Sequence, residues 1–188
     1  MKDGTLFLGW VRIDDRLIHG QVTVGWRQYL KYREIWVVDD EVREDPYLWD
    51  ALRLAVPAGV EARRLGVGEA ATVLTGPETA KAAPAKDRTT NGVFALNRSA
   101  AGSSVLMLLR EPEVAVALVE GGVSLARVNV GNLGSRPGSV RVFKNVSLTA
   151  AHVAALDALA RRGIEVFFQL APEDPRLEWE VVRRRLRL

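Results

Sequence analysis

The segment TLFLGWVRIDDRLIHGQ, residues 5–21, contains the change of pattern that decides the fold. Residues 5–13 form an apolar run that predicts a β-strand, and over 21–32 the apolar residues recur at helical spacing. The turn between the two patterns is polar and charged. A strand that passes through a short turn into a helix begins a βαβ unit, so this segment predicts an α/β protein.

Strand and helix patterns alternate along the rest of the chain. Short apolar runs predict strands at 34–39, 60–65, 104–109, 126–130 and 164–170. Periodic apolar residues or capping signals predict helices at 45–56, 68–75, 112–121, 149–162 and 175–188. Strands separated by helix-length segments imply right-handed βαβ units, so we predict a single α/β domain: an open, mainly parallel sheet with helices on both faces.

The composition is that of one globular domain. The chain has 188 residues, 48% of them hydrophobic, which is enough for a sizeable core, and we take 1–188 as one unit. It has no cysteine, which excludes disulfides and fits a reducing compartment. No apolar stretch spans a bilayer and no secretory leader is visible, so we expect a cytoplasmic protein that does not span the membrane. The net charge of +3 is too small to indicate nucleic-acid binding.

Two segments depart from the regular pattern. Residues 76–102 are rich in Ala, Thr, Pro, Gly and Ser and have little periodicity, so we interpret them as a surface insertion within the domain. Near the C-terminus, four basic residues cluster: Arg183, Arg184, Arg185 and Arg187. We interpret this basic cluster as the solvated end of the last helix, where cations suit the helix dipole. The alternative is a docking patch for an acidic partner or a membrane surface.

The turn after the first predicted strand carries the residues of a phosphoryl-carrying site. In an open parallel sheet, ligands bind beyond the carboxyl ends of the strands, and His19 follows such an end. A neutral imidazole can attack phosphorus, while its second nitrogen needs an acceptor, such as the Asp14 carboxylate or a backbone carbonyl. Positive charge and N–H donors stabilise the phosphoryl group, and the residues placed to supply them are Arg16, Arg12, Gly20 and Gln21.

A simpler interpretation of the same turn has to be weighed. A histidine in a loop is more often an ordinary surface residue, and Asp14, Asp15 and Arg16 together would then form a turn with a surface ion pair. The location of all these residues at one strand end favours chemistry. His152, the second histidine, lies within the helix predicted after Thr149, and we expect it at the surface.

The segment RIDDRLIHGQV, residues 12–22, resembles the signature of the enzyme IIB component of the mannose/fructose/sorbose class of the bacterial phosphoenolpyruvate-dependent sugar phosphotransferase system. The likeness continues in IWVVDDEVREDP (35–46), LAVPAGVEA (54–62), VNVGN (128–132) and VSLTAAHVAALDALARRGIEVFFQLAPED (146–174). It therefore covers nearly the whole chain outside 76–102. The family fold is an open, mostly parallel α/β sheet, in agreement with the pattern.

The resemblance implies that His19 receives a phosphoryl group from the phosphohistidine of a IIA protein. It would pass the group to a sugar that enters through the membrane components IIC and IID, which would hold the protein at the inner face of the membrane. The neighbours of His19 would be Arg12, Asp14, Arg16 and Gln21, with Asp39, Asn129 and Gly131 lining the same edge from other strands. The transfer needs neither cofactor nor metal, and the oligomeric state is left open, a homo-oligomer included.

The chain departs from the family pattern at two places. Residues 76–102 look like an insertion, and the turn after Val130 reads Gly131-Asn132-Leu133-Gly134 where the family would have a glycine pair. Three basic residues follow that turn, and they could serve either the phosphate or a partner: Arg136, Arg141 and Lys144.

Three other functions compete with the phosphoryl carrier. Residues 66–71 fit a loose G-x-G-x-x-A pattern, but they do not follow the first strand as a nucleotide-binding loop does. A metal enzyme is weakly supported. Four carboxylates could lie at one edge of the sheet, namely Asp14, Asp15, Asp39 and Asp40, but two histidines and no cysteine leave few other metal ligands. A regulatory protein that keeps the phosphorylated histidine without transport would have an identical loop, so the sequence leaves this alternative open.

Overall fold

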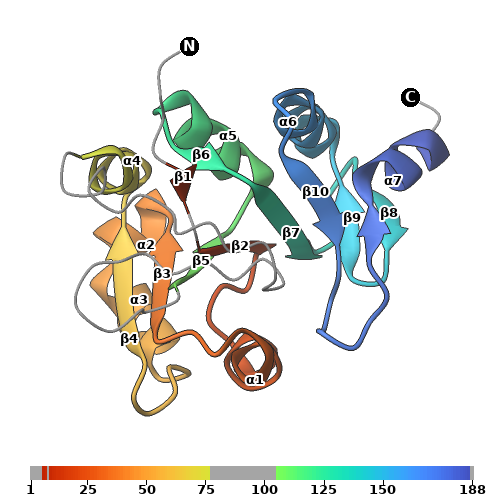
Figure 1. The fold of residues 1–188 in the computed structure, drawn as a ribbon. Helices are drawn as coiled ribbons and strands as arrows, with labels where there is room; N and C mark the ends of the chain where they lie inside the picture. The colour runs from red at the N-terminus through yellow and green to blue at the C-terminus, as the bar shows by residue number, and fades with distance from the viewer. Residues whose placement is uncertain (1–5, 8, 77–104, 187–188) are drawn as a thin grey trace, which may run out of the picture.

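The structure is a computed structural model that describes residues 6–7, 9–76 and 105–186 (Figure 1). The predicted insertion at 76–102 lies outside these residues except for Gly76, and Arg187 of the basic cluster lies outside them as well. Among the described residues, no helix is both long and apolar enough to cross a membrane.

A seven-stranded sheet forms the centre of the domain, in the order β11-β10-β7-β2-β5-β3-β4. All neighbouring strands are parallel except β11, which is antiparallel to β10. The strands are β2 (Trp10–Asp14), β3 (Glu34–Val38), β4 (Glu61–Leu65), β5 (Val105–Leu109), β7 (Arg127–Asn132), β10 (Glu165–Phe168) and β11 (Leu177–Glu178). The predicted open, mainly parallel sheet is confirmed.

Two small sheets flank the main one. β1 (Leu6–Phe7) pairs in parallel with β6 (Ser124–Leu125), and β8 (Val140–Phe143) forms an antiparallel hairpin with β9 (Val146–Leu148). The strand predicted at 5–13 is therefore wrong as a single element. Its described residues fall into two strands, β1 and β2, that belong to different sheets.

Helices cover both faces of the sheet, as predicted (Figure 1). One apolar cluster joins the sheet to η1 (Gln21–Trp26), α1 (Arg27–Leu30), α2 (Asp40–Glu44) and α3 (Pro46–Arg53). A second cluster, on the other face, joins it to α4 (Val67–Thr75), α5 (Pro112–Glu120), α6 (Ala150–Arg161) and α7 (Trp179–Arg185). The inner strands β3, β5 and β10 are buried on both sides, which explains their nearly continuous apolar sequences.

Capping residues set where several helices begin and end. Asp45 caps α3 by accepting from the N–H groups of Tyr47 and Leu48, and Pro46 occupies the first helical position. Thr149 caps α6 by accepting from the N–H of His152. After the end of α6, Gly163 has a φ of +79°, a conformation that costs glycine little. These three signals were predicted from the sequence.

Three helical predictions need correction. The helix expected at 21–32 begins as a π-helix, η1, and ends at Leu30, because Lys31 adopts a φ of +52°. The five-residue helix α2 precedes the one predicted from Asp45 and was missed. The last helix was expected from 175, but residues 177–178 pair with β10 first.

The carboxyl end of β2 lies where the connections diverge to opposite faces. After β2 the chain enters η1 and α1 on one face, whereas after its neighbours β5 and β7 it leads to α5 and α6 on the other. Such a switch point opens a crevice at the carboxyl edge of a parallel sheet. The turn 14–19 occupies this position.

Candidate functional site: a histidine held by a buried carboxylate

Asp14 is the centre of the site. It is the last residue of β2, its side chain is fully buried, and the pairing with β7 shifts register between Ile13 and Asp14. Its carboxylate contacts three cationic or titratable side chains, which are Arg12, Arg16 and His19. The extra residue at this irregularity is on β7, where Asp14 pairs with Asn132 and Gly131 is passed over, at the edge of the sheet where β2 ends.

His19 is bound to this carboxylate through one ring nitrogen. Its Nε2 lies 3.0 Å from Asp14 Oδ2, and its side chain is 18% exposed. Of the described residues, none forms a hydrogen bond with Nδ1. Because an ionised carboxylate can only accept, Nε2 carries the proton in the neutral imidazole, and Nδ1 keeps its lone pair.

The protonation state of Asp14 follows from its surroundings. Burial by itself raises the pKa of the carboxyl. The hydrogen bond from His19 and the charge of Arg12 outweigh this effect and lower the pKa from 3.8 to about 2. Asp14 is thus ionised at neutral pH. It can fix the tautomer of His19 and stabilise positive charge that develops on the ring.

Arg16 is the exposed cation of the site. Its Nε lies 3.2 Å and its Nη2 3.3 Å from the two oxygens of Asp14, and Nη2 also donates to Gln21 Oε1 at 3.3 Å. The side chain is 42% exposed, so part of the guanidinium faces solvent beside His19. The sequence-based expectation that Arg16, Gln21 and His19 lie together agrees with this geometry.

Arg12 is buried beneath Asp14. Its five N–H donors make five hydrogen bonds, with acceptors on Asp14, Asn129, Gln169 and Leu170. The residue is fully buried, and its guanidinium lies over the ring of Trp26, with Cζ 5.1 Å from the ring centroid. Arg12 has no donor left for a phosphoryl group, contrary to the sequence-based expectation, because all of its N–H groups are bonded inside the protein. It instead orients Asp14.

Asn129 and Gly131 both lie beside Arg12, within strand β7; Gly131 was expected in a turn after Val130, but the strand continues to Asn132. Asn129 Oδ1 accepts from Arg12 Nη1 at 2.6 Å, and its Nδ2 donates to Gln169 O. A Cβ atom on Gly131 would lie 1.9 Å from Arg12 Cζ. Glycine is therefore needed at 131 to leave room for the guanidinium.

The turn from Asp14 to His19 has a constrained backbone. Leu17 is buried and adopts a φ of +55°, which a branched side chain rarely does, and its N–H donates to Asp14 O at 2.9 Å. Gly20 follows in a helical conformation, with no atom within 4 Å of the place where a Cβ would be. The space beside Gly20 is open, as close approach of a phosphate requires.

Asp15 attaches the connection after β7 to this turn. Its carboxylate accepts from Asn132 Nδ2 and, at 2.7 Å, from the N–H of Gly134. Arg136 Nη2 lies 3.9 Å from the same carboxylate and 2.5 Å from Glu111 Oε1. Neither contact could be expected from the sequence, because Asn132 reaches Asp15 through the pairing of β2 with β7, and Glu111, which follows β5, is linked to Asp15 only through Arg136.

Asp39 is placed one strand further away. It follows β3, which is separated from β2 by β5, and it caps α2 by accepting from Val42 N at 2.8 Å. Its other partner is Arg110, whose Nε lies 2.7 Å from Oδ2. Asp39 lies at the same edge of the sheet as expected, but the structure joins it to Arg110 and not to His19.

His152 is buried, so the prediction of a surface residue is wrong. It is 4% exposed, its Nδ1 accepts from Thr149 N at 3.3 Å, and its Nε2 lies 3.1 Å from Glu111 Oε2. With Glu113 these groups form a cluster whose polar atoms lie within 4.8 Å. The cluster fits a metal poorly, because Nδ1 is the acceptor, which leaves the proton on the nitrogen that would bind metal, and because Arg136 lies beside Glu111.

The fold and the site together define an α/β domain with an accessible, carboxylate-bound histidine at the switch point of a parallel sheet. The family model described as "PTS system sorbose subfamily IIB component" matches residues 8–84 and 94–186, and the chain belongs to that family. It is accordingly a phosphotransferase-system IIB component of the mannose/fructose/sorbose class. Residues 85–93 lie between the two matched ranges.

Known relatives agree with this assignment. The chain is 33% identical over 173 residues to the PTS system mannose-specific EIIAB component of Escherichia coli K12, covering 92% of this chain but 47% of the relative. The chain thus spans about half the length of that protein. It is 30% identical to the sorbose-specific EIIB component of Lacticaseibacillus casei, with 87% of each chain covered.

Solved structures show the same fold. The IIBSor domain of the sorbose permease from Klebsiella pneumoniae superposes with a TM-score of 0.77 at 25% identity, covering 96% of this chain and 97% of that one. The N-acetylgalactosamine-specific IIB component 1 from Escherichia coli gives a TM-score of 0.70 at 27% identity, with 93% and 97% covered.

Proposed function

We propose that His19 is a phosphoryl carrier: it accepts a phosphoryl group on Nδ1 from the phosphohistidine of a IIA protein and passes it to a sugar. The observation that carries this proposal is the contact between His19 Nε2 and the buried Asp14 carboxylate, which leaves Nδ1 as the nucleophilic nitrogen. Family membership supports phosphoryl transfer as the reaction, and the geometry of the site supports His19 as the residue that carries the phosphoryl group.

The proposed transfer balances without a cofactor. The Nδ1 lone pair forms the new bond to phosphorus, and the bond from phosphorus to the donor imidazole breaks with its electrons returning to that ring. His19 keeps its proton on Nε2 and so gains positive charge, which the Asp14 carboxylate offsets. Arg16, half-exposed beside the ring, stabilises the oxygens of the moving phosphoryl group.

The partners follow from the same proposal. The donor is a IIA protein, and the acceptor is a sugar bound by the membrane components IIC and IID, at the cytoplasmic side. In that second step the sugar hydroxyl loses its proton as it bonds to phosphorus, and the electrons of the P–N bond return to His19. The relatives named above are all described as phosphotransferase or permease components, which favours transport over the regulatory alternative.

Phosphorylation by a cognate IIA protein tests the assignment. Incubation with phosphorylated IIA should place one acid-labile phosphoryl group on the peptide that contains His19, detected by mass spectrometry. His19→Ala should abolish the uptake and retain the circular dichroism spectrum, because His19 lies at the edge of the core. The matched variant His152→Ala should still be phosphorylated; a phosphoryl group found on His152 would refute the proposal.

A further inference from the structure

The turn that carries His19 has a strained backbone. Leu17 adopts a φ of +55°, which a non-glycine residue rarely does and which persists only where the surrounding structure enforces it. Arg12 holds Asp14 at the start of this turn, and Asp14 contacts His19. Asp15, the next residue, takes no part in the proposed phosphoryl transfer and makes a separate set of contacts. These contacts give the turn a second support.

Asp15 fastens the turn to the connection between β7 and β8. Its backbone N–H donates to Asn132 O at 3.2 Å. Its Oδ1 accepts from Asn132 Nδ2, and its Oδ2 accepts from the N–H of Gly134 at 2.7 Å. The turn therefore keeps its place only if the connection, residues 133–139, keeps its own.

Arg136 ties this connection to the rest of the domain. Its Nη2 lies 2.5 Å from Glu111 Oε1 and 3.9 Å from Asp15 Oδ2, so one guanidinium lies between two carboxylates. The backbone of Arg136 is fixed as well, because its N–H donates to Ser139 Oγ and its carbonyl accepts from the same hydroxyl. The positive charge between Glu111 and Asp15 replaces the repulsion of two like charges with attraction.

Glu111 is held from its other side by the buried His152. It precedes α5, and its Oε2 lies 3.1 Å from His152 Nε2. The N–H of Thr149 donates to His152 Nδ1, so the proton of the neutral ring is on Nε2 and faces Glu111. Burial by itself raises the pKa of Glu111, but His152 and Arg136 outweigh this effect and lower it, so Glu111 is ionised. A chain of contacts thus runs from α6 through Glu111 and Arg136 to Asp15.

We propose that Arg136 is a positioning residue for the phosphorylation of His19. It bridges Glu111 and Asp15 and so fixes the turn on the side of Asp15. The turn then keeps the conformation in which His19 Nε2 lies 3.0 Å from the Asp14 carboxylate. The effect of Arg136 on the rate rests on the proposed function, whereas its effect on the position of His19 stands on the contacts alone.

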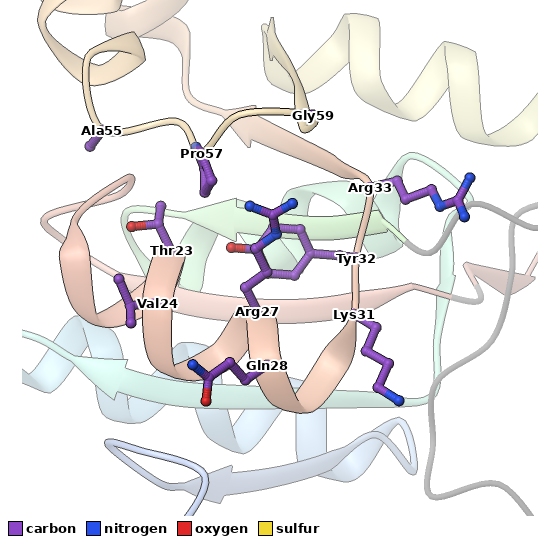
Figure 2. Close-up of a pocket in the computed structure, with 10 residues that line it drawn as sticks. All are labelled: Thr23, Val24, Arg27, Gln28, Lys31, Tyr32, Arg33, Ala55, Pro57 and Gly59. Atoms are coloured by element: carbon purple, nitrogen blue, oxygen red, sulfur yellow. The ribbon is translucent and has the colours of Figure 1, made fainter.

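Two other arginines provide matched controls. Arg141 is an exposed residue of β8, and no contact among the described residues joins its side chain to Asp15 or Glu111. Arg33 precedes β3 at the opposite edge of the sheet, and its side chain extends away from helix α1 (Figure 2). Arg141→Gln and Arg33→Gln therefore remove the same charge as Arg136→Gln but leave the bridge intact. Arg136 is 39% exposed, so its replacement does not open the core.

The position of His19 is measured by NMR on the unphosphorylated protein at alkaline pH, where the ring is neutral. The nitrogen signals of the ring distinguish a protonated from an unprotonated nitrogen. The unsubstituted chain should hold its proton on Nε2, facing Asp14, whereas Arg136→Gln should give a mixture of the two tautomers. Arg136→Lys, which retains the charge, should keep the Nε2–H tautomer, and so should both control variants. A single Nε2–H tautomer in Arg136→Gln would overturn the proposal.

The rate of His19 phosphorylation is measured with phosphorylated IIA at varied concentrations. Arg136→Gln should lower kcat about tenfold with KM unchanged, because a misplaced imidazole reaches the geometry of attack less often. Arg136→Lys should recover most of the rate, and Arg141→Gln and Arg33→Gln should retain it. A higher KM at unchanged kcat would show that Arg136 contacts IIA itself, and it would overturn the positioning role.

A double-mutant cycle tests whether Arg136 acts through Asp15. In the Asp15→Ala background, Arg136→Gln should lower kcat by less than about twofold, because the contact through which it acts is already absent. Two full effects that multiply would show that Arg136 acts by another route, contrary to the proposal. If His19 of the unsubstituted chain accepts no phosphoryl group, the proposed function fails, and the tautomer measurement still decides the role of Arg136.

Discussion

At the scale of single residues, Arg12 and Gly131 depend on each other. The guanidinium of Arg12 makes all five of its hydrogen bonds inside the protein, and it passes through the space that a side chain at 131 would need. A buried charge that is this fully bonded cannot shift without leaving donors unsatisfied. The packing of one glycine therefore decides whether Asp14 is held in place.

Gly131→Ala should lower the free energy of unfolding by about 3 kcal/mol, because the new methyl group displaces a buried, paired arginine. Urea denaturation followed by circular dichroism measures this change. Gly68→Ala is the matched control, since no atom lies within 4 Å of its added Cβ and alanine favours a helix. Equal stabilities of the two variants would contradict the proposed dependence of Arg12 on Gly131.

Asp14 should make stability depend on pH in the acid range. Its pKa is about 2 in the folded protein against an ordinary 3.8, so the folded state favours the ionised form. The ionised Asp14 carboxylate therefore contributes about 2 kcal/mol to the free energy of unfolding. This contribution is complete above the pKa of the unfolded state, near pH 4, and it is lost as the pH falls through the folded pKa, near 2. An NMR titration of the side-chain carboxyl carbons should show Asp14 titrating near pH 2; a titration near pH 4, like that of a solvated carboxyl, would contradict the coupling to His19.

At the scale of elements, the sheet edge is assembled by connections. The turn after β2 is tied to the connection after β7 by Asp15, and the connection is tied in turn to α5 through Arg136 and Glu111. Secondary-structure patterns identify the strands but say nothing about which loops bond each other. The π-helical start of η1 was likewise not predicted, because its residues have the apolar spacing of an ordinary helix.

Asp15→Ala should free the connection after β7, because it removes the acceptor of the Gly134 N–H and of Asn132 Nδ2. We expect hydrogen exchange at the Gly134 amide to accelerate about tenfold, in keeping with a loss of about 1–2 kcal/mol. Asp50→Ala, an exposed carboxylate of α3, is the control and should leave this amide unchanged. Unaltered exchange in Asp15→Ala would show that the connection is held by other contacts.

At the scale of the whole molecule, one sheet separates two apolar clusters. Leu156 of α6 is fully buried on one face, and Leu30 of α1 is 3% exposed on the other. Because β2, β3, β5 and β10 each contribute side chains to both clusters, neither face can unfold while the other keeps its sheet. The two halves should therefore behave as one cooperative unit.

Leu156→Ala and Leu30→Ala should each lower the free energy of unfolding by about 2–5 kcal/mol and shift the same single transition. Leu54→Ala, the same substitution at a side chain that is 89% exposed, should change it by less than about 0.5 kcal/mol. Denaturation monitored in parallel by tryptophan fluorescence and circular dichroism provides the check. Two separate transitions would show that the faces unfold independently.

The sequence by itself determined the α/β class, the strands β3 and β5, the caps Asp45 and Thr149, and the turn that carries His19. These features depend on local chemistry, such as apolar periodicity, capping side chains and glycine, which can be recognised along the chain. Only the tertiary structure decided the burial of His152 and the full bonding of Arg12. Both depend on groups more than 30 residues away, because the strand order brings distant parts of the chain into contact.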